Sequence, residues 1–362
     1  MNTVLDDAIE ALLNDAIARR LMPGAVVGYL AEGRRVVRPF GHLNYGANAP
    51  EVTRTTVYDV ASITKVLPTN TLLLQLIERD KIALDDKVID YLPEMDNPYR
   101  DMMRIRHLLS YTVQVSLDTN INFYAQSHPE KFLDLLSHAP LVHPPGHSYK
   151  YSDVPAIWMG QIVERVYGEP LDKVAQRELF DPMGLGSTTF WPVAGSQVAP
   201  TEFNRRGLVQ GEVHDETAWS MRSQGVVVGS AGVFSTTDDL LCFADMLIKS
   251  GSTSAAQILS EETVASLSRV EPASRRPRGW FIEHDEPDGM GVLSGSLHMK
   301  GFTGSMVMWH PKAKRAVVVT ANCLLPERPA DREVIYEFWR QLGRIVLPAK
   351  LDVESKFNDV TI

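Results

Sequence analysis

Residues 294–323 read SGSLHMKGFTGSMVMWHPKAKRAVVVTANC, and this stretch decides the fold. It holds three runs rich in β-branched and large apolar residues, separated by glycine, proline and lysine residues that are typical of turns. The pattern predicts three successive strands joined by short connections. The next segment, residues 332–347 (REVIYEFWRQLGRIVL), has apolar residues at helical spacing and predicts a closing helix.

The beginning of the chain has the same two kinds of element. Residues 1–21 carry apolar side chains at helical spacing, and residues 25–42 contain two β-like runs around a glycine turn, which predicts a hairpin. From residue 62 to about residue 190 the pattern is mostly helical, with Pro68 expected to kink the first helix or mark its first turns. Residues 195–232 have weak periodicity, which predicts a boundary or a loop that lines a site.

This order of elements predicts an α/β (α+β) fold: an antiparallel sheet flanked by helices, with an α-helical insertion domain. We assign residues 1–70 and 225–362 to a discontinuous sheet domain and residues 71–224 to a mainly helical domain, with the active site between them.

Composition excludes several classes of protein. Of the 362 residues 44% are apolar and 22% are charged, which is typical of a globular protein and not of a disordered chain. No apolar run approaches the ~18 residues that a membrane span needs. The net charge of −9, from 45 acidic and 36 basic residues, disfavours nucleic acid as a partner.

Cysteine usage and the first residues suggest a compartment. The two cysteines, Cys242 and Cys323, stand in apolar surroundings that predict buried thiols without a disulfide framework. The first helix is acidic where an export signal would be basic. We therefore expect a cytoplasmic protein, although a chain that had lost a signal peptide would look the same and would be periplasmic.

Ser62 and Lys65 form the only Ser-x-x-Lys pattern of the chain, where an apparent loop becomes a helix. Positions i and i+3 of a helix share a face, so the amine can reach the hydroxyl, and the helix N-terminus favours negative charge there. A desolvated lysine has a lowered pKa and could act as a general base. The alternative is a capping serine followed by a solvated lysine.

Two further segments carry polar groups at the ends of predicted helices or strands. Residues 151–153 (Tyr-Ser-Asp) open a helix, and a phenol near a cationic lysine can shuttle a proton to a leaving group; the alternative is a packed tyrosine beside a cap. Residues 301–305 (Gly-Phe-Thr-Gly-Ser) lie between two strands. Their glycines allow a ligand to approach the backbone, and a donor here could complete an oxyanion hole with the Ser62 N–H; the alternative is a turn or bulge.

In this order the three segments resemble the serine β-lactamase and penicillin-binding-protein family, especially its class C-like esterase and D-amino peptidase branch. The first two motifs start 89 positions apart (151 minus 62), which is similar to the family's separation. Further segments that look like family sequence, among them DPMGLGSTTF, GEVHDETA and AGVFSTTDDLLCFADML, extend the resemblance over nearly the whole chain.

The resemblance implies a β-lactamase/transpeptidase-like fold and chemistry through an acyl-enzyme. Ser62 would be the nucleophile, Lys65 its base and Tyr151 the carrier of the proton to the leaving group. The backbone N–H groups of Ser62 and Phe302 would form the oxyanion hole. The chemistry requires no metal and no organic cofactor. We assign substrate contacts to Gly301, Phe302, Asp153, Met299, Lys300 and His298.

The third motif departs from the family pattern. Where relatives read H-T-G-F-T-G, residues 299–304 read Met-Lys-Gly-Phe-Thr-Gly. Met299 takes the usual His or Lys slot, His298 should face the other side of the strand unless a bulge re-aims it, and Lys300 could offer a cation from a displaced position. Family peptidases and β-lactamases hold a substrate carboxylate here, so the change weakens the case for both. Residues 110–116 (SYTVQVS) depart in a cleft-lining loop.

Other polar and aromatic groups have more ordinary interpretations. The clusters at 214–216 and 284–286 (both His-Asp-Glu) lack the spacing of metal ligands, and we expect them in solvated loops. Trp219 and Trp280 could bind an apolar part of a substrate or pack in the core.

The sequence thus predicts a serine acyl hydrolase acting through a covalent acyl-enzyme on a small-molecule ester or amide. A D-amino peptidase or weak DD-carboxypeptidase and an acyltransferase would use the same residues. A non-catalytic binding or sensor protein of the same fold is the alternative from another class. The sequence makes no prediction of the oligomeric state.

Overall fold

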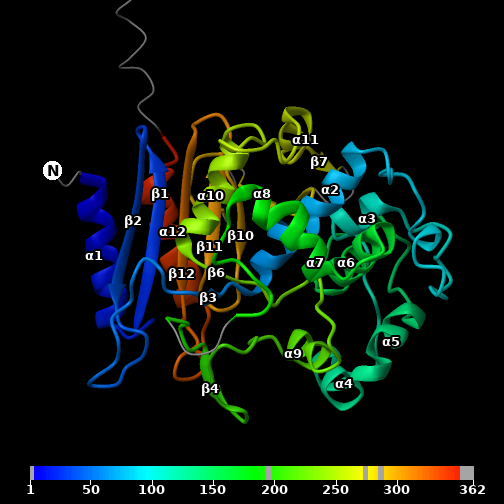
Figure 1. The fold of residues 1–362 in the computed structure, drawn as a ribbon, viewed down its shortest axis with the longest axis horizontal. Helices are drawn as coiled ribbons and strands as arrows, with labels where there is room; N and C mark the ends of the chain where they lie inside the picture. Colours follow the sequence, from blue (N-terminus) through cyan, green and yellow to red (C-terminus); the bar gives the residue numbers. More distant parts are fainter. Residues whose placement is uncertain (1–3, 193–196, 272–275, 284–288, 351–362) are drawn as a thin grey trace, which may run out of the picture.

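A computed structural model describes residues 4–192, 197–271, 276–283 and 289–350. Its centre is a six-stranded sheet in the order β2-β1-β12-β11-β10-β9, in which every pair of neighbours is antiparallel (Figure 1). The predicted antiparallel sheet is therefore confirmed. The strands are β1 (Gly24–Ala31), β2 (Arg34–Gly41), β9 (Phe281–Ile282), β10 (Leu297–Lys300), β11 (Met306–His310) and β12 (Arg315–Ala321).

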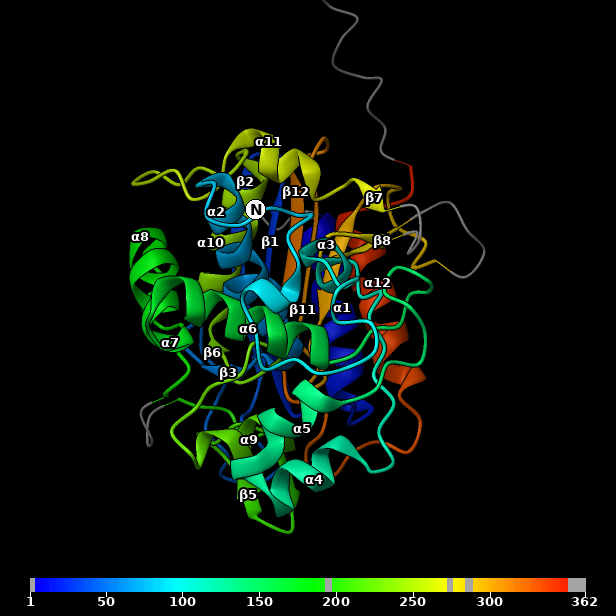
Figure 2. The same cartoon turned by 90° about the vertical axis from the view of Figure 1, so that its right-hand side faces the viewer.

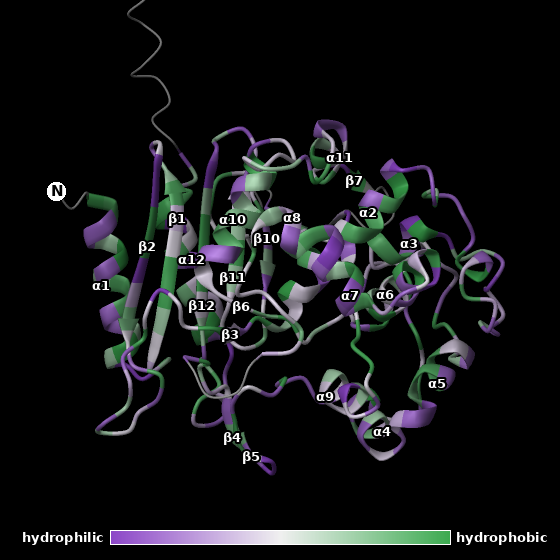
Figure 3. Ribbon diagram, in the orientation of Figure 1, coloured by the Kyte–Doolittle hydropathy of each residue, from purple (hydrophilic) through white to green (hydrophobic). Residues whose placement is uncertain are grey.

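Helices cover both faces of this sheet. On one face α1 (Val4–Ala18) and α12 (Glu333–Val346) bury their apolar sides, which is why α1 shows both hydrophobic and hydrophilic residues in Figure 3. On the other face lies α10 (Thr237–Ile248). A Cβ at Gly28 of β1 would lie 2.8 Å from the Cγ2 atom of Thr237, so only glycine lets α10 approach the sheet this closely.

A block of helices packs on the same side of the sheet as α10. Figure 2 shows this block in front of the sheet, and its apolar residues form one core with that face of the sheet. The helices of the block are α2 (Thr71–Glu78), α3 (Ile105–Leu109), α4 (Ile121–Ser127), α5 (Phe132–His138), α6 (Val154–Tyr167), α7 (Leu171–Ala175), α8 (Asp181–Met183) and α9 (Glu216–Arg222), and α11 (Glu261–Ser266) lies near α2.

Three small strand pairs lie outside the main sheet. β3 (Tyr58–Asp59) pairs with β6 (Phe234–Ser235) and leads directly into the Ser-x-x-Lys segment. The hairpin β4 (Glu202–Asn204) and β5 (Gly207–Val209) projects at the lower edge of the molecule in Figure 1. The third pair is β7 (Val270–Glu271) with β8 (Arg276–Pro277).

The helix expected over residues 62–82 is interrupted where Pro68 stands. A 3₁₀ turn (Ala61–Lys65) and a π-helical turn (Val66–Asn70) precede α2. Proline has no N–H to donate to the α-helical ladder, so the backbone widens locally instead of continuing as α-helix.

Other expectations about the fold have mixed outcomes. Cys323 is buried as predicted, whereas Cys242 is half-buried, with its Sγ atom 3.3 Å from Arg35 Nη2. No helix in the described ranges is both long and apolar enough to cross a membrane. The division of the chain at residues 70 and 225 stays a prediction.

Candidate active site

The Ser-x-x-Lys segment begins with a strained backbone. Ala61, directly before Ser62, has a φ of 47°, in the left-handed region that residues with a side chain rarely adopt. The carboxylate of Asp59 holds this conformation, because it accepts hydrogen bonds from the Ala61 N–H at 2.8 Å and the His214 N–H at 2.7 Å. Ser62 is thereby presented on a fixed turn, half-buried.

Lys65 is buried, and three acceptors surround its ammonium group. Its Nζ atom lies 2.8 Å from Ser62 Oγ, 2.8 Å from the carbonyl oxygen of Ser230 and 2.7 Å from Asp153 Oδ1. Burial lowers the pKa of Lys65, but the Asp153 carboxylate raises it further, so the pKa lies above its ordinary value of 10.5. The expected lowered pKa is therefore wrong, and Lys65 is a fixed cation at neutral pH.

Tyr151 lies at the entrance of α6, next to this cation. Lys65 Nζ is 5.3 Å from the centroid of the Tyr151 ring. The ring packs between Tyr111 and Phe281, with centroid separations of 5.2 and 5.3 Å. Tyr111 belongs to the unusual SYTVQVS segment and has a φ of 53°. The sequence pointed to the 110–116 segment as a cleft-lining loop but to neither Tyr111 nor Phe281 individually.

The glycine-rich segment 301–304 packs against the residues that precede Ser62. A Cβ at Gly301 would lie 2.5 Å from the carbonyl oxygen of Val60, so a side chain is excluded there. Thr303 Oγ1 donates a hydrogen bond to the Asp59 carbonyl oxygen at 2.8 Å. The structure thus brings the first and third motifs together, as the oxyanion-hole hypothesis requires.

The side chains of β10 alternate as the sequence analysis predicted. Met299 is fully buried, with its Sδ atom 4.0 Å from the Tyr151 hydroxyl. His298 turns away from it and places Nε2 2.7 Å from Glu283 Oε1. Lys300 Nζ lies 5.1 Å from the ring centroid of Tyr336 on α12. A thioether therefore occupies the position next to Tyr151, and Lys300 Nζ also lies 5.5 Å from the ring centroid of Phe281, which packs on Tyr151.

The expectation of a solvated loop is wrong for residues 214–216. His214 is buried and stacks on the Phe302 ring at a centroid separation of 5.4 Å. Asp215 caps α9, where its Oδ1 atom accepts a hydrogen bond from the Ala218 N–H at 2.8 Å. Burial and the nearby Asp153 carboxylate raise the pKa of Asp215 to about 6. The capping pattern before a helix was the signal that could have identified this residue.

The remaining candidates from the sequence have separate outcomes. Trp280 is buried in the core, at a centroid separation of 5.9 Å from Trp309. Trp219 is half-buried, and the Arg206 guanidinium lies 4.8 Å from its ring centroid. The cluster at 284–286 lies outside the described residues. Within the described ranges no group of three or more His, Cys, Asp or Glu residues could hold a metal ion.

The raised pKa of Asp215 predicts that the free energy of unfolding depends on pH. Asp215 has a pKa of 3.8 in the unfolded chain and about 6 in the folded protein. Its contribution to the free energy of unfolding is therefore fully present below pH 3.8 and is lost as the pH rises through about 6. Asp215→Asn keeps the helix cap and removes the charge. We expect the variant to exceed wild type in free energy of unfolding by about 1–3 kcal/mol at pH 8 and to match it near pH 4.

Urea unfolding at several pH values measures this difference, with Asp118→Asn on the exposed surface as the control. A difference between Asp215→Asn and wild type that does not change with pH would contradict the assignment.

Comparisons with known proteins find similar sequences over most of this chain. A family model described as Beta-lactamase matches residues 6–338. A protein of Salmonella agona (strain SL483) named "Putative D-alanyl-D-alanine carboxypeptidase" is 29% identical over 305 residues, which cover 75% of this chain and 70% of the relative.

Solved structures resemble the fold over almost its whole length. The LovD9 mutant of simvastatin synthase from Aspergillus terreus superimposes with a TM-score of 0.74 at 21% identity, covering 94% of this chain and 98% of the other. EstCE1, described as a hydrolase with promiscuous acyltransferase activity, gives 0.71 at 22% identity and the same coverage. A penicillin-binding-protein homologue from Caulobacter crescentus gives 0.72 at 16% identity, covering 93% and 96%.

Proposed function

This chain belongs to the β-lactamase family of serine hydrolases, and we propose that it hydrolyses small esters or amides through an acyl-enzyme on Ser62. The observation that carries the proposal is the buried Lys65, whose ammonium contacts the Ser62 hydroxyl at 2.8 Å beside the Tyr151 ring. Such a cation next to a half-buried serine favours the negative charge that develops on the attacking oxygen.

The proton has to leave Ser62 by a route other than Lys65. Because the raised pKa of Lys65 keeps its ammonium group protonated, we assign the proton transfer to Tyr151, whose ring lies beside that ammonium. The Ser62 oxygen bonds to the carbonyl carbon as its proton passes to the Tyr151 oxygen. The Tyr151 hydroxyl proton passes to the leaving group, whose bond to the carbonyl carbon breaks. Water then repeats the sequence and releases the acid.

The oxyanion would be held by two backbone donors, the N–H groups of Ser62 and Phe302. The contact of Gly301 with the Val60 carbonyl and the hydrogen bond from Thr303 to Asp59 support this role, since both fix the second segment against the first. Asp153 would position Lys65 through their 2.7 Å ion pair.

Labelling with a fluorophosphonate tests the proposal. A covalent adduct that maps to Ser62 supports a serine hydrolase. No adduct at any pH would favour a non-catalytic binding protein of the same fold.

Met299 directs the choice of substrate toward neutral esters. A thioether offers neither a charge nor a strong donor to a carboxylate, and the Lys300 ammonium lies over the rings of Phe281 and Tyr336. This disfavours a carboxypeptidase acting on peptides with a free D-alanine carboxylate, although the Salmonella relative carries that name.

A side chain at position 299 that can donate a hydrogen bond to a carboxylate should shift the preference. We expect Met299→His to raise the ratio of kcat/KM for a D-alanyl-D-alanine peptide to that for a p-nitrophenyl ester by roughly ten- to over a hundredfold, the worth of a charge-assisted hydrogen bond. Steady-state kinetics on both substrates, with Lys300→Ala for comparison, measures this ratio. A wild type that already prefers the peptide, or a Lys300→Ala variant that loses that preference, would assign the carboxylate to Lys300.

An acyltransferase is the second candidate. EstCE1, which shares the fold, is described as a hydrolase with promiscuous acyltransferase activity. The covalent intermediate would be the same, and only the acceptor would differ. Adding a primary alcohol to the ester assay distinguishes the two, because transfer gives a new ester while the rate of p-nitrophenol release rises.

A further inference from the structure

The N–H group of Phe302 belongs to a peptide group whose direction is fixed. The Gly304 N–H donates a hydrogen bond to the Gly301 carbonyl oxygen at 3.1 Å. The C=O and N–H groups of a trans peptide point in opposite directions, so the Phe302 N–H points away from this turn. Within the described ranges it donates to no protein acceptor, which leaves it available to a substrate.

Arg332, at the start of α12, contacts Phe302 in two ways. Its guanidinium carbon lies 3.7 Å from the centroid of the Phe302 ring. Its Nη2 atom donates a hydrogen bond to the Phe302 carbonyl oxygen at 3.1 Å. Phe302 is 39% exposed, so solvent alone would leave its ring free to turn. One planar group therefore restrains both the ring and the peptide group that follows it.

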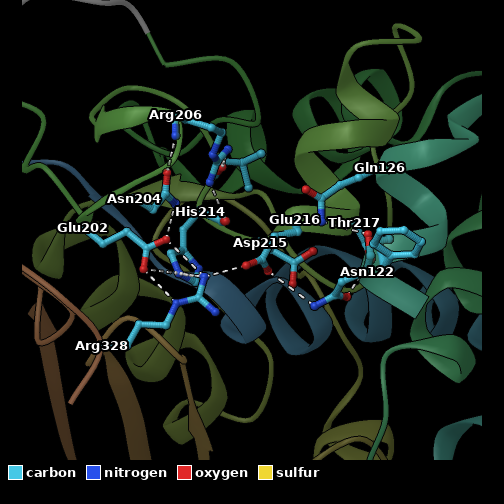
Figure 4. Close-up of polar contacts among 12 residues, drawn as sticks. Asn122, Gln126, Glu202, Asn204, Arg206, His214, Asp215, Glu216, Thr217 and Arg328 are labelled. Carbon is cyan, nitrogen blue, oxygen red and sulfur yellow. Dashed lines mark hydrogen bonds and ion pairs between the residues drawn. The ribbon is translucent and has the colours of Figure 1, made fainter. Parts of the chain in front are cut away.

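The cluster around Arg328 holds a second planar group, the His214 imidazole, against the same ring. His214 Nε2 lies 3.1 Å from Arg328 Nη2 and 3.4 Å from Glu202 Oε2 (Figure 4). Arg328 also donates to Glu202 at 2.8 Å and to Glu216 at 2.6 Å, so the charges of the cluster are compensated. The Phe302 ring thus stacks on an imidazole that is itself held in place.

Two other donors of Arg332 are unsatisfied. Its Nε and Nη1 atoms are buried and have no hydrogen-bond partner among the described residues. Buried donors without acceptors lower the stability of a fold, so packing alone does not explain a guanidinium here. Because these two atoms are buried, they are also not exposed to a substrate. The side-chain donor that Arg332 uses is directed to Phe302.

We propose that Arg332 is a positioning residue of the oxyanion hole. By holding the ring and the carbonyl group of Phe302, it keeps the Phe302 N–H directed at the negative charge that develops on the substrate oxygen. This role rests on the proposed acyl-enzyme function. It adds a residue that lies outside the three motifs and acts on the reaction through Phe302 alone.

The variant Arg332→Met removes both contacts and keeps an apolar stem. We expect kcat/KM for p-nitrophenyl acetate to fall roughly ten- to a hundredfold, because a displaced donor stabilises the oxyanion less. The fall should lie in kcat, with KM within about twofold of wild type, since the oxyanion forms only in the transition state. The free energy of unfolding should equal or exceed that of wild type, because two unsatisfied donors are removed.

Arg340→Met is the matched control. It removes a guanidinium from the same helix, where Arg340 pairs with Glu333 and Glu337 and makes no contact with Phe302 in the described structure. We expect its kcat/KM to stay within about twofold of wild type.

Inhibition by phenylboronic acid reports on the oxyanion hole without turnover. The Ser62 oxygen bonds to boron and its proton passes to solvent, which leaves a tetrahedral anion with one oxygen in the oxyanion hole. The inhibition constant of Arg332→Met should therefore rise by about the factor by which its kcat/KM falls. A residue that only supported the fold would not link these two quantities.

Two further variants separate positioning from charge. Arg332→Lys keeps the charge, but an ammonium group cannot cover the ring and hold the carbonyl group as a planar guanidinium does, so its rate should stay within about threefold of Arg332→Met. In a Phe302→Ala background, which lacks the ring, the fall caused by Arg332→Met should be at least about threefold smaller than in wild type.

Three results would overturn the positioning role. They are full recovery of the rate in Arg332→Lys, an unchanged boronic acid affinity in Arg332→Met, and a loss confined to substrates with a free carboxylate, which would make Arg332 a substrate ligand. Failure of the proposed function has a different signature. It would appear as absence of fluorophosphonate labelling at Ser62 in wild type, whatever the Arg332 variants show.

Discussion

Ser62→Ala should lower turnover of p-nitrophenyl acetate to at least a thousandfold below wild type, because no other hydroxyl contacts the Lys65 ammonium in the described structure. The hydroxyl is half-buried and its removal leaves little empty space, so the melting temperature should stay nearly unchanged. Stopped assays at high enzyme concentration measure the residual rate.

The matched control is Ser252→Ala, which removes another half-buried hydroxyl in the segment that follows α10 and should keep wild-type turnover. If Ser62→Ala hydrolyses the ester at a rate comparable with this control, Ser62 is not the nucleophile.

Lys65→Met should have the next largest effect. The variant removes the cation that faces Ser62 and Tyr151 and leaves the Asp153 carboxylate without its partner. We expect kcat/KM to fall by about a thousandfold or more. Stability should fall by on the order of 1–3 kcal/mol, less than for a fully buried pair because the Asp153 side chain is 35% exposed.

A double variant separates the two effects. Asp153→Asn added to Lys65→Met removes the unpaired charge, so the stability should return toward wild type while activity stays low. Urea unfolding and ester hydrolysis on the four proteins of this cycle measure both quantities. Recovery of activity in the double variant would show that Lys65 serves only to neutralise Asp153.

The fold was predictable where periodicity and turn residues agree. The strands β10, β11 and β12 and the helix α12 follow from residues 294–347, since alternation and helical spacing are local properties. The interruption at Pro68 was predictable in kind, but not its geometry, because a kink, a first turn and a π-helical turn all accommodate a missing N–H.

The candidate site was predictable as a set of motifs, and its electrostatics were not. Ser62, Lys65 and Tyr151 were identified from their motifs, and the structure places them together. The raised pKa of Lys65 depends on the distance to Asp153, which is 88 positions away in the chain (153 minus 65). A motif identifies a lysine, but the carboxylate that keeps it charged is a tertiary contact.

The aromatic surroundings of Tyr151 and the cluster around Arg328 were also beyond the sequence. Tyr111 and Phe281 come from different parts of the chain and meet only at the Tyr151 ring. His214 was expected in solvent because its neighbours are acidic, but the Asp59 carboxylate and the Phe302 ring bury it. Local polarity predicts exposure only where no distant residue covers the segment.

The central claim is that Ser62 carries the acyl group. Wild type mixed with p-nitrophenyl acetate and quenched in acid within the first turnover, then digested and analysed by mass spectrometry, tests it most directly. We expect one acetyl group on the peptide that contains Ser62, absent from Ser62→Ala. An acetyl group on any other residue, or ester hydrolysis with no acetylated peptide at any quench time, would contradict it.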